Sequence, residues 1–299
     1  MAGSGERDFK RRIRSITNTE QITAAMEMVA AAKLRQAEEA AESSRPYADK
    51  LAEVLSRLSA VASDVKHPLL ERRETVNNTT YIVVTGDRGL CGAFNSNVVR
   101  AASEALEQET REVENGICGV GRRGRDFFRK RGFKMQGEFV NLGDDITFTQ
   151  AKEIGQFIIQ LYEEGATDEV YLLYAKFINV LRQEPTLVKL LPIEPPQEEK
   201  AVDTEQTGYI ADYLYEPGAD AILTALLPRY VESQVYHAML ESKASEHGAR
   251  MTAMGNATQN ARELIDELTL QMNKARQAAI TSEILEIVGG AEALRKGGN

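Results

Sequence analysis

The chain has 299 residues, with 36 Lys and Arg against 45 Asp and Glu, which gives a net charge of −9. This acidic balance excludes a nucleic-acid binder that acts through bulk positive charge, because neutralising phosphates needs a basic surface. Hydrophobic residues make up 42% of the chain and aromatic residues 6%, so we expect an aliphatic, alanine-rich core. The two cysteines, Cys91 and Cys118, favour a reducing compartment over a disulfide scaffold.

The start of the chain carries no recognisable targeting signal. Met1 to Asp8 is short and charged, without the apolar segment of a secretory signal or the Arg/Ser-rich pattern of a transit peptide. No run of about 18 apolar residues could span a bilayer. These features predict a bacterial-type cytoplasmic protein that works at a membrane only as a peripheral part of something larger.

The N-terminal segment has the composition of a long helix. From Phe9 to about Ala62 there is no glycine, and Ala, Glu, Lys, Arg, Leu and Met dominate. Apolar residues such as Ile22 and Met26 recur at helical spacing, and Pro46 is the only proline. We expect one long helix, kinked or briefly broken at Pro46.

The C-terminal segment has the pattern of a coiled-coil seam, with steps that alternate between three and four residues. The seam positions are Met251, Met254, Thr258, Ala261, Ile265, Leu268, Met272, Ala275 and Ala279. A helix from about Ala219 to Val288 would be roughly 100 Å long, and only Pro228, Gly248 and Gly255 interrupt its helix formers. The two glycines are expected to soften an exposed helix locally.

A coiled-coil seam needs a partner helix. The alanine-rich N-terminal helix could supply it within the chain, as an antiparallel pair. The alternative is pairing between two copies of the chain in a homodimer. Patterning favours the intrachain pair and leaves the dimer open.

Between the two helices, buried-strand patterns alternate with helical ones. Strands are predicted at Tyr81–Thr85, Ile117–Val120 and Val170–Tyr174, with an edge strand at Thr186–Leu191. The expected helices cover Asn95–Leu106, Gly124–Arg131 and Thr149–Glu163. This order predicts a Rossmann-like α/β domain with parallel strands, inserted between the rod helices.

The expected domain boundaries follow from these patterns. Residues 1–65 form the N-terminal coiled-coil helix, and residues 77–193 form the α/β domain. An acidic, proline-containing linker covers 194–208. Residues 209–299 form a strand followed by the C-terminal coiled-coil helix.

Two glycine motifs lie at strand ends. Gly86, Gly89 and Gly92 follow the first strand, but no Walker A sequence is present, so a structural turn is favoured over a phosphate site. The run from Gly119 to Gly124 matches G-x-G-x-x-G, with Glu138 beyond it. Because it follows the second strand and is a lone match, a tight turn is favoured, and an NAD-dependent oxidoreductase is the alternative function.

No group of residues has the pattern of a catalytic, cofactor or metal site. His67, His237 and His247 are scattered without a ligand partner at suitable spacing. The two cysteines are expected to be buried structural thiols. We therefore predict no catalytic residues, no cofactor and no metal.

Three motifs carry a family resemblance. They are Met26 to Leu34 (MEMVAAAKL), Asp87 to Gly92 (DRGLCG) with Asn95, and Ile280 to Ala291 (ITSEILEIVGGA). With the entry YLYEP at Tyr213 to Pro217, they resemble the gamma subunits of bacterial F-type rotary ATP synthases, over essentially the whole chain.

The resemblance implies a rotor subunit without its own catalytic site. In this family the terminal helices form an antiparallel coiled coil inside a hexamer of alpha and beta subunits. The α/β domain lies toward the membrane ring of c subunits and the epsilon subunit. One copy per complex would couple proton flow to ATP synthesis or hydrolysis. Such a protein would be peripheral, on the cytoplasmic face of the bacterial inner membrane, and would touch the membrane only through the complex.

The resemblance also implies contact residues. Matching positions assign contacts with the alpha and beta subunits to Met26, Arg250, Arg276, Gln277 and Thr281. Contacts with the c-ring and the epsilon subunit fall to Tyr213, Tyr215 and Glu216. The long dithiol insertion of the plant chloroplast form is absent, so thiol gating by that route is not expected.

Overall fold

The structure is a computed structural model that describes residues 2–61, 67–109, 111–194 and 218–297. The chain divides into two compact units, one made of residues 1–29 with 251–299 and the other of residues 30–250. The two longest helices, α1 (Ala2–Val61) and α5 (Ala219–Gly297), each contribute to both units. Residues 30–61 of α1 and 219–250 of α5, called the inner halves below, therefore belong to the larger unit, which contains the α/β domain.

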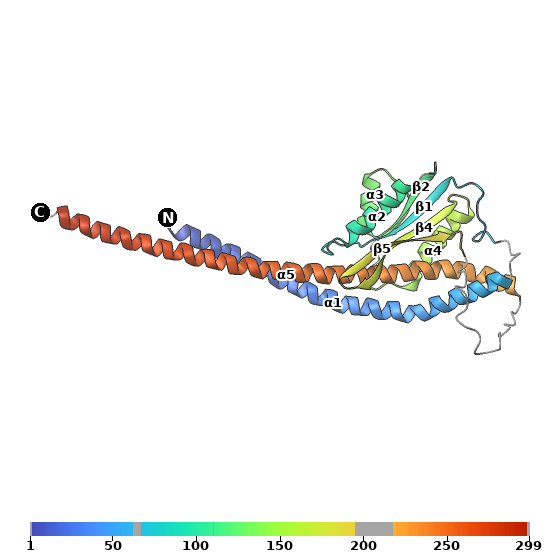
Figure 1. The fold of residues 1–299 in the computed structure, drawn as a ribbon, viewed down its shortest axis with the longest axis horizontal. Helices are drawn as coiled ribbons and strands as arrows, with labels where there is room; N and C mark the ends of the chain where they lie inside the picture. The colour runs from blue at the N-terminus through green and yellow to red at the C-terminus, as the bar shows by residue number, and fades with distance from the viewer. Residues whose placement is uncertain (1, 62–66, 110, 195–217, 298–299) are drawn as a thin grey trace. The chain divides into compact units, whose positions relative to one another are not determined.

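A five-stranded sheet forms the centre of the larger unit (Figure 1). In chain order its strands are β1 (Asn78–Val84), β2 (Glu114–Val120), β3 (Lys134–Phe139), β4 (Glu169–Asn179) and β5 (Arg182–Leu191). The spatial order is β3-β2-β1-β4-β5, with four parallel strands and β5 antiparallel at the edge. The predicted Rossmann-like domain is confirmed, with a mixed rather than wholly parallel sheet.

Alternating residues of β1 divide the core into two layers. Tyr81 and Val83 pack against α2 (Phe94–Gln108) and α3 (Arg122–Lys130). Ile82 and Val84 face the opposite layer, formed by α4 (Phe148–Glu163) and the inner halves of α1 and α5. The sheet is thus covered on both faces, as buried parallel strands require.

The predicted long N-terminal helix is confirmed, and of its two alternatives at Pro46, a kink or a brief break, the break is wrong because α1 continues through Pro46. Figure 1 shows α1 curved along its 30–61 part. Proline removes one backbone hydrogen bond and bends a helix, but buried Ala41 and Leu51 anchor the helix on both sides. Pro228 likewise lies inside α5 without ending it.

Strand β3 was not predicted from the sequence. Its residues read KMQGEF, a mixed segment with two charges and a glycine, and it lies at the sheet edge. An edge strand needs no continuous apolar run, because only part of its surface is buried. The predicted edge strand at Thr186–Leu191 is confirmed and begins earlier, at Arg182.

The sequence suggested that the two glycines of α5 lie in an exposed helix, but neither glycine is exposed. Gly248 is buried, and a Cβ atom there would be 3.2 Å from the Phe177 ring. At the half-buried Gly255, a Cβ atom would be 3.1 Å from the Glu27 carboxylate. Each glycine therefore allows another part of its own unit to approach α5 closely.

Two expectations fall largely outside the described residues. The linker at 194–208 is described only at its first residue, and the strand expected at 209–216 is not described. Within the described helices, no segment is long and apolar enough to cross a membrane.

Candidate interaction surfaces

The G-x-G-x-x-G run packs tightly against the end of β1. Gly121 has a φ of +91°, and a Cβ atom there would lie 2.1 Å from the Thr85 carbonyl oxygen. A Cβ atom on Gly124 would lie 2.9 Å from Thr85 Oγ1. Both glycines are thus required by the close approach of the α3 start to β1.

The backbone N–H groups of Arg122 and Gly124, at the start of α3, already donate hydrogen bonds to side chains of this chain. The Arg122 backbone N–H donates to Asp87 Oδ1 at 2.9 Å, and the Gly124 N–H donates to Thr85 Oγ1 at 2.9 Å. In dinucleotide-binding folds the amides at this position hold a phosphate. The geometry therefore favours the tight turn over the oxidoreductase alternative.

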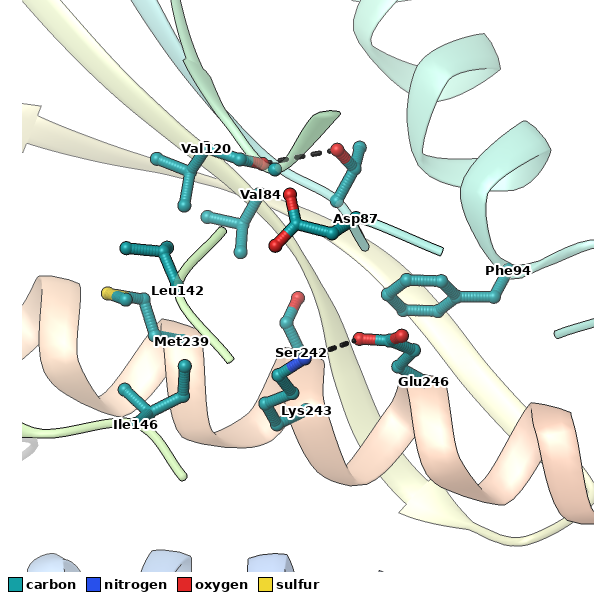
Figure 2. Close-up of a pocket in the computed structure, with 12 residues that line it drawn as sticks. Val84, Asp87, Phe94, Val120, Leu142, Ile146, Met239, Ser242, Lys243 and Glu246 are labelled. Atoms are coloured by element: carbon teal, nitrogen blue, oxygen red, sulfur yellow. Dashed lines mark hydrogen bonds and ion pairs between the residues drawn. The ribbon is translucent and has the colours of Figure 1, made fainter. Parts of the chain in front are cut away.

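Helix α5 lies beyond the carboxyl end of β1 and beside β4, where the Ala175 N–H donates to Ser242 Oγ at 3.1 Å and the Ser245 hydroxyl donates to the Ala175 carbonyl at 2.9 Å. In open α/β sheets ligands bind beyond the carboxyl ends of the strands. Figure 2 shows Lys243 and Glu246 of α5 reaching toward Asp87 and the ends of β1 and β2. The space between α5 and the ends of β1 and β2 is about 20 Å³, which is room for roughly one water molecule; a separate hollow of about 300 Å³ lies on the other side of Asp87, Lys243 and Glu246, lined by Arg88, Arg122 and Asp144. A dinucleotide does not fit the smaller of these spaces.

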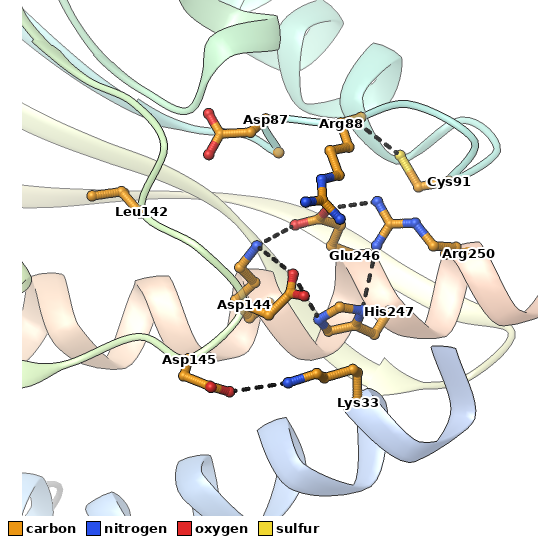
Figure 3. Close-up of polar contacts among 12 residues, drawn as sticks. Lys33, Asp87, Arg88, Cys91, Leu142, Asp144, Asp145, Glu246, His247 and Arg250 are labelled. Carbon is orange, nitrogen blue, oxygen red and sulfur yellow. Dashed lines mark hydrogen bonds and ion pairs between the residues drawn. The ribbon is translucent and has the colours of Figure 1, made fainter. Parts of the chain in front are cut away.

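An ionic cluster surrounds Glu246, which is 3% exposed. Its carboxylate accepts hydrogen bonds from Arg250 at 2.6 Å and from Lys243 at 2.9 Å (Figure 3). Burial opposes ionisation, yet Lys243 and Arg250 together lower the Glu246 pKa below its usual value. The cluster is thus a buried carboxylate held between two cations.

This cluster joins several segments of the larger unit. Arg250 donates to the Gly89 carbonyl at 3.4 Å, in the turn after β1. Lys243 Nζ lies 3.8 Å from the Asp144 carboxylate, in the loop before α4. In the same loop, Asp145 pairs with Lys33 of α1 at 3.3 Å. Charged groups therefore connect α5 to the turn after β1 and to the loop before α4, and they connect α1 to that loop as well.

His247 lies beside this cluster and is 3% exposed. Burial lowers its pKa, and the neighbouring Glu246 only partly offsets this effect. Arg250 Nη1 lies 3.3 Å from His247 Nδ1. Burial also raises the pKa of the Cys91 and Cys118 thiols, the latter to about 12, which confirms the prediction of buried structural thiols.

In the smaller unit, the N-terminal part of α1 and the C-terminal part of α5 form an antiparallel pair. The Thr258 hydroxyl donates to Thr23 Oγ1 at 2.8 Å. The Arg262 guanidinium donates to Glu20 at 2.9 Å. As α5 advances from 258 to 262, its partner residue on α1 moves back from 23 to 20. The predicted intrachain antiparallel coiled coil is confirmed.

The same unit exposes many large apolar side chains, at exposed fractions between 48% and 71%. They are Ile22, Met28, Val29, Leu264, Leu270, Ile280, Ile284, Leu285, Ile287 and Val288. Residues 280–291 of α5 are all exposed. A surface this rich in apolar side chains marks a site of protein contact.

The residues expected to contact partners lie in different places. Arg276, Gln277 and Thr281 are exposed on α5, and the Thr281 hydroxyl donates to the Gln277 carbonyl at 2.9 Å. Met26 is half-buried on α1. The Arg250 side chain belongs to the larger unit and is 11% exposed. Tyr213, Tyr215 and Glu216 lie outside the described residues.

Sequence reasoning missed two features of these surfaces. The exposed apolar side chains Ile284, Leu285 and Ile287 lie off the coiled-coil seam, and their off-seam position was the available signal. The buried Lys243–Glu246 pair was missed because charges three residues apart on a helix usually indicate a solvated face.

The fold and these surfaces define a stalk-type assembly subunit, with an α/β domain between two terminal helices that pair and expose apolar side chains. A family model described as ATP synthase matches residues 5–294. The ATP synthase gamma chain of Desulforamulus reducens is 54% identical over 289 residues, covering 96% of this chain and 98% of the relative. The ATP synthase gamma chain of Heliobacterium modesticaldum is 53% identical, covering 97% and 99%.

Solved structures of ATP synthases also contain chains similar to this one. A chain in the structure of the central stalk and c-ring of the Tetrahymena thermophila mitochondrial ATP synthase has a TM-score of 0.59 and 26% identity, covering 79% of this chain and 99% of that one. A chain of the Euglena gracilis mitochondrial ATP synthase shares the fold, with a TM-score of 0.64 at 20% identity, covering 99% and 96%. The chain belongs to the family of ATP synthase gamma chains, and its function is that of a central-stalk rotor subunit.

Proposed function

We propose that the smaller unit is the part of the rotor that enters a hexamer of alternating alpha and beta subunits. The observation that carries this proposal is the apolar surface of α5, where Ile280, Ile284, Leu285, Ile287 and Val288 are about half or more exposed. In an isolated protein each such side chain forgoes the stabilisation of burial. A surrounding partner would supply it.

The larger unit would receive rotation from the c-ring and the epsilon subunit through Tyr213, Tyr215 and Glu216. One copy of the chain would serve each complex and carry no catalytic site of its own. Proton flow through the ring would turn the chain, which would drive the catalytic sites of the beta subunits through their conformations. No nucleic acid takes part in this cycle.

Individual contacts follow from the exposure of the matching residues. Arg276, Gln277 and Thr281 are free to meet loops of the beta subunits, and Met26 would pack beside an acidic beta segment. Arg250 would have to exchange Glu246, now 2.6 Å away, for a beta-subunit carboxylate. Its contact therefore depends on a rearrangement of the ionic cluster.

We place the protein at the cytoplasmic face of the bacterial inner membrane, as a peripheral subunit that meets the membrane only through the complex. The high identity to bacterial gamma chains supports this location.

Affinity purification from gently solubilised membranes tests the proposal. The exposed turn at Glu164 to Ala166 is a suitable tag position, because a Cβ atom on Gly165 would meet nothing within 4 Å. Recovery of alpha, beta, epsilon and c subunits with one copy of this chain is expected. Recovery of the chain alone or as a homodimer would contradict the proposal.

Arg276→Ala then tests one contact. ATP synthesis in membrane vesicles should fall while the amount of assembled complex stays constant, because the interaction acts during rotation. Arg35→Ala is the control, since the Arg35 side chain is 84% exposed on α1 and has no assigned partner subunit.

A further inference from the structure

Helix α1 loses its close contact with the rest of the larger unit along one stretch. Ala41 and Leu51 are buried, but every residue between them is exposed or half-buried, over roughly two and a half turns. Pro46 lies in this stretch, and Pro228 lies in the facing part of α5. Proline bends helices, so both walls of the gap contain a residue that favours their separation.

The gap contains a cavity of about 300 Å³. This is at the lower end of the range of small-molecule sites, about 300–1,000 Å³. Its lining comes from three helices and includes Tyr47 of α1, Phe148 of α4, and Arg229, Ser233 and Tyr236 of α5. The Phe148 and Tyr236 rings meet edge to face, with centroids 5.6 Å apart. The cavity thus has an aromatic wall suited to a flat ring.

Hydroxyl groups that can donate hydrogen bonds also line the cavity. Ser233 is only 5% exposed, yet its hydroxyl has no hydrogen-bond partner among the residues that the structure describes. Tyr47, which is 58% exposed, and the half-buried Tyr236 add two further hydroxyl groups to the lining. The Ser233 hydroxyl is not one of the described polar atoms that are shut off from solvent without a partner. It opens on the cavity, where a ligand acceptor would take its hydrogen bond in place of water.

Arg229 provides a positive charge at the same site. Its side chain is 50% exposed and pairs with Glu232 at 3.3 Å. A guanidinium carries five N–H donors, so donors remain for a ligand. The Glu232 side chain is 4% exposed, and its nearby carboxylate disfavours a highly charged anion such as phosphate.

We propose that this cavity binds a small aromatic monoanion, such as an aryl carboxylate. The ring lies against Phe148 and Tyr236, and the carboxylate accepts hydrogen bonds from Arg229 and Ser233. A protein segment is too large for this volume, and a single cation beside a carboxylate matches one negative charge. The site is separate from the partner contacts proposed above and does not depend on them.

Calorimetric titration of the full chain with naphthoate tests the proposal. One saturable site per chain is expected. Ala48→Phe should abolish it, because Ala48 lines the cavity and the new ring would fill it while keeping a helical residue in α1. Circular dichroism checks that each variant keeps its helix content. Binding that survives Ala48→Phe would place the probe elsewhere, such as on the exposed apolar side chains of α5, and would overturn the proposal.

A matched pair of arginine variants tests the role of charge. Arg229→Gln should weaken naphthoate binding about tenfold but leave the uncharged naphthalene methanol unaffected. Arg35→Gln, at an exposed arginine of the same unit, should change neither. Equal weakening by both variants, or no saturable binding by the unaltered chain, would contradict an anion site at Arg229.

Discussion

The two compact units of this chain place their apolar and charged side chains in opposite ways. The larger unit fully buries aliphatic residues such as Leu55, Ile158 and Leu227, and it also buries the charged Glu246. Among the described residues of the smaller unit, the buried ones are small, polar or flexible: Thr23, Met254, Thr258 and Ala261. Many of its large apolar side chains, such as Ile22, Leu285 and Ile287, are instead exposed.

This difference teaches which unit carries its own stability. A core of buried aliphatic side chains stabilises the larger unit without help, since each contributes about 1.5–3 kcal/mol. The smaller unit has a thin seam and leaves much of its potential hydrophobic stabilisation unused. It is the part of the molecule that gains most from a partner. The predictions below test that contrast.

The largest expected effect is at Glu246. Replacing it with alanine takes the shared carboxylate away from Lys243 and Arg250, whose side chains are 12% and 11% exposed, and leaves them only the longer contacts to Asp144 and the Gly89 carbonyl. Breaking a buried pair in this way costs about 3–5 kcal/mol. Urea unfolding followed by circular dichroism should show this loss.

Glu20→Ala is the control in the smaller unit. Glu20 pairs with Arg262, whose side chain is 60% exposed, and exposed pairs contribute about 0–1 kcal/mol. A loss at Glu20 as large as that at Glu246 would contradict the contrast between the two units.

The next effect is expected at the turn before α3. Gly121→Ala combines an unfavourable φ of +91° with a Cβ atom 2.1 Å from the Thr85 oxygen, and should destabilise by about 3 kcal/mol. Gly132→Ala separates the two causes. Gly132 has a φ of +78° and nothing within 4 Å of the added carbon, so we expect only about 1 kcal/mol. Equal losses in urea unfolding would show that the close approach to Thr85 does not matter.

The features of the fold that could be predicted are those that depend on residues close together in the sequence. The long helices and the strand cores follow from composition and spacing, and the structure confirms them. The seam is confirmed from Met251 to Met272, but the predicted seam residue Ala275 is exposed. The sequence left open whether α1 is kinked or broken at Pro46, because the choice depends on tertiary contacts at Ala41 and Leu51 on the two sides of the proline. Strand β3 was missed because pairing to β2, rather than its own pattern, makes it a strand.

The candidate sites show the same division. The glycine motif was correctly favoured as a turn, but its reason, the close approach to Thr85, required the fold. Glu246 and Lys243 have the sequence pattern of a solvated helix face, and only the position of α5 over the sheet edge buries them. The residues proposed to contact partners came from family resemblance, and the physical patterns of the chain gave no separate signal for them.

A smaller effect is expected at the buried seam of the coiled coil. Thr258→Val leaves the Thr23 hydroxyl without this partner and should cost about 1 kcal/mol. The double variant Thr23→Val with Thr258→Val should recover part of the loss, because an apolar pair of the same shape replaces both hydroxyls. Thermal unfolding of the three variants measures this coupling, and strictly additive losses would rule it out.

The stability of the larger unit should also depend on pH through His247. Burial lowers its pKa in the folded chain, below the ordinary value of 6.5. Below that pH the unfolded chain takes up a proton that the folded chain resists, so the free energy of unfolding decreases as pH falls. His247→Gln should reduce the dependence of the free energy of unfolding on pH in this range. Burial also lowers the pKa of His67, and the contribution of His67 is the same in the variant and in the unaltered chain. An unchanged profile in urea unfolding between pH 7 and pH 5 would contradict the role of His247.

The smallest effect on the isolated chain is expected where the effect on assembly is greatest. Ile284 and Leu285 are 54% and 66% exposed, so replacing both with serine removes no buried contact and should change the free energy of unfolding by less than about 0.5 kcal/mol. In the assembled complex the same side chains would be covered, and serine would lose their hydrophobic stabilisation. Co-purification should therefore yield less of the alpha and beta subunits with this variant. Leu181→Ser is the matched control, because Leu181 is 85% exposed at the β4–β5 turn of the larger unit. If both variants assembled equally well, the exposed apolar surface of α5 would not be the reason why the smaller unit needs a partner.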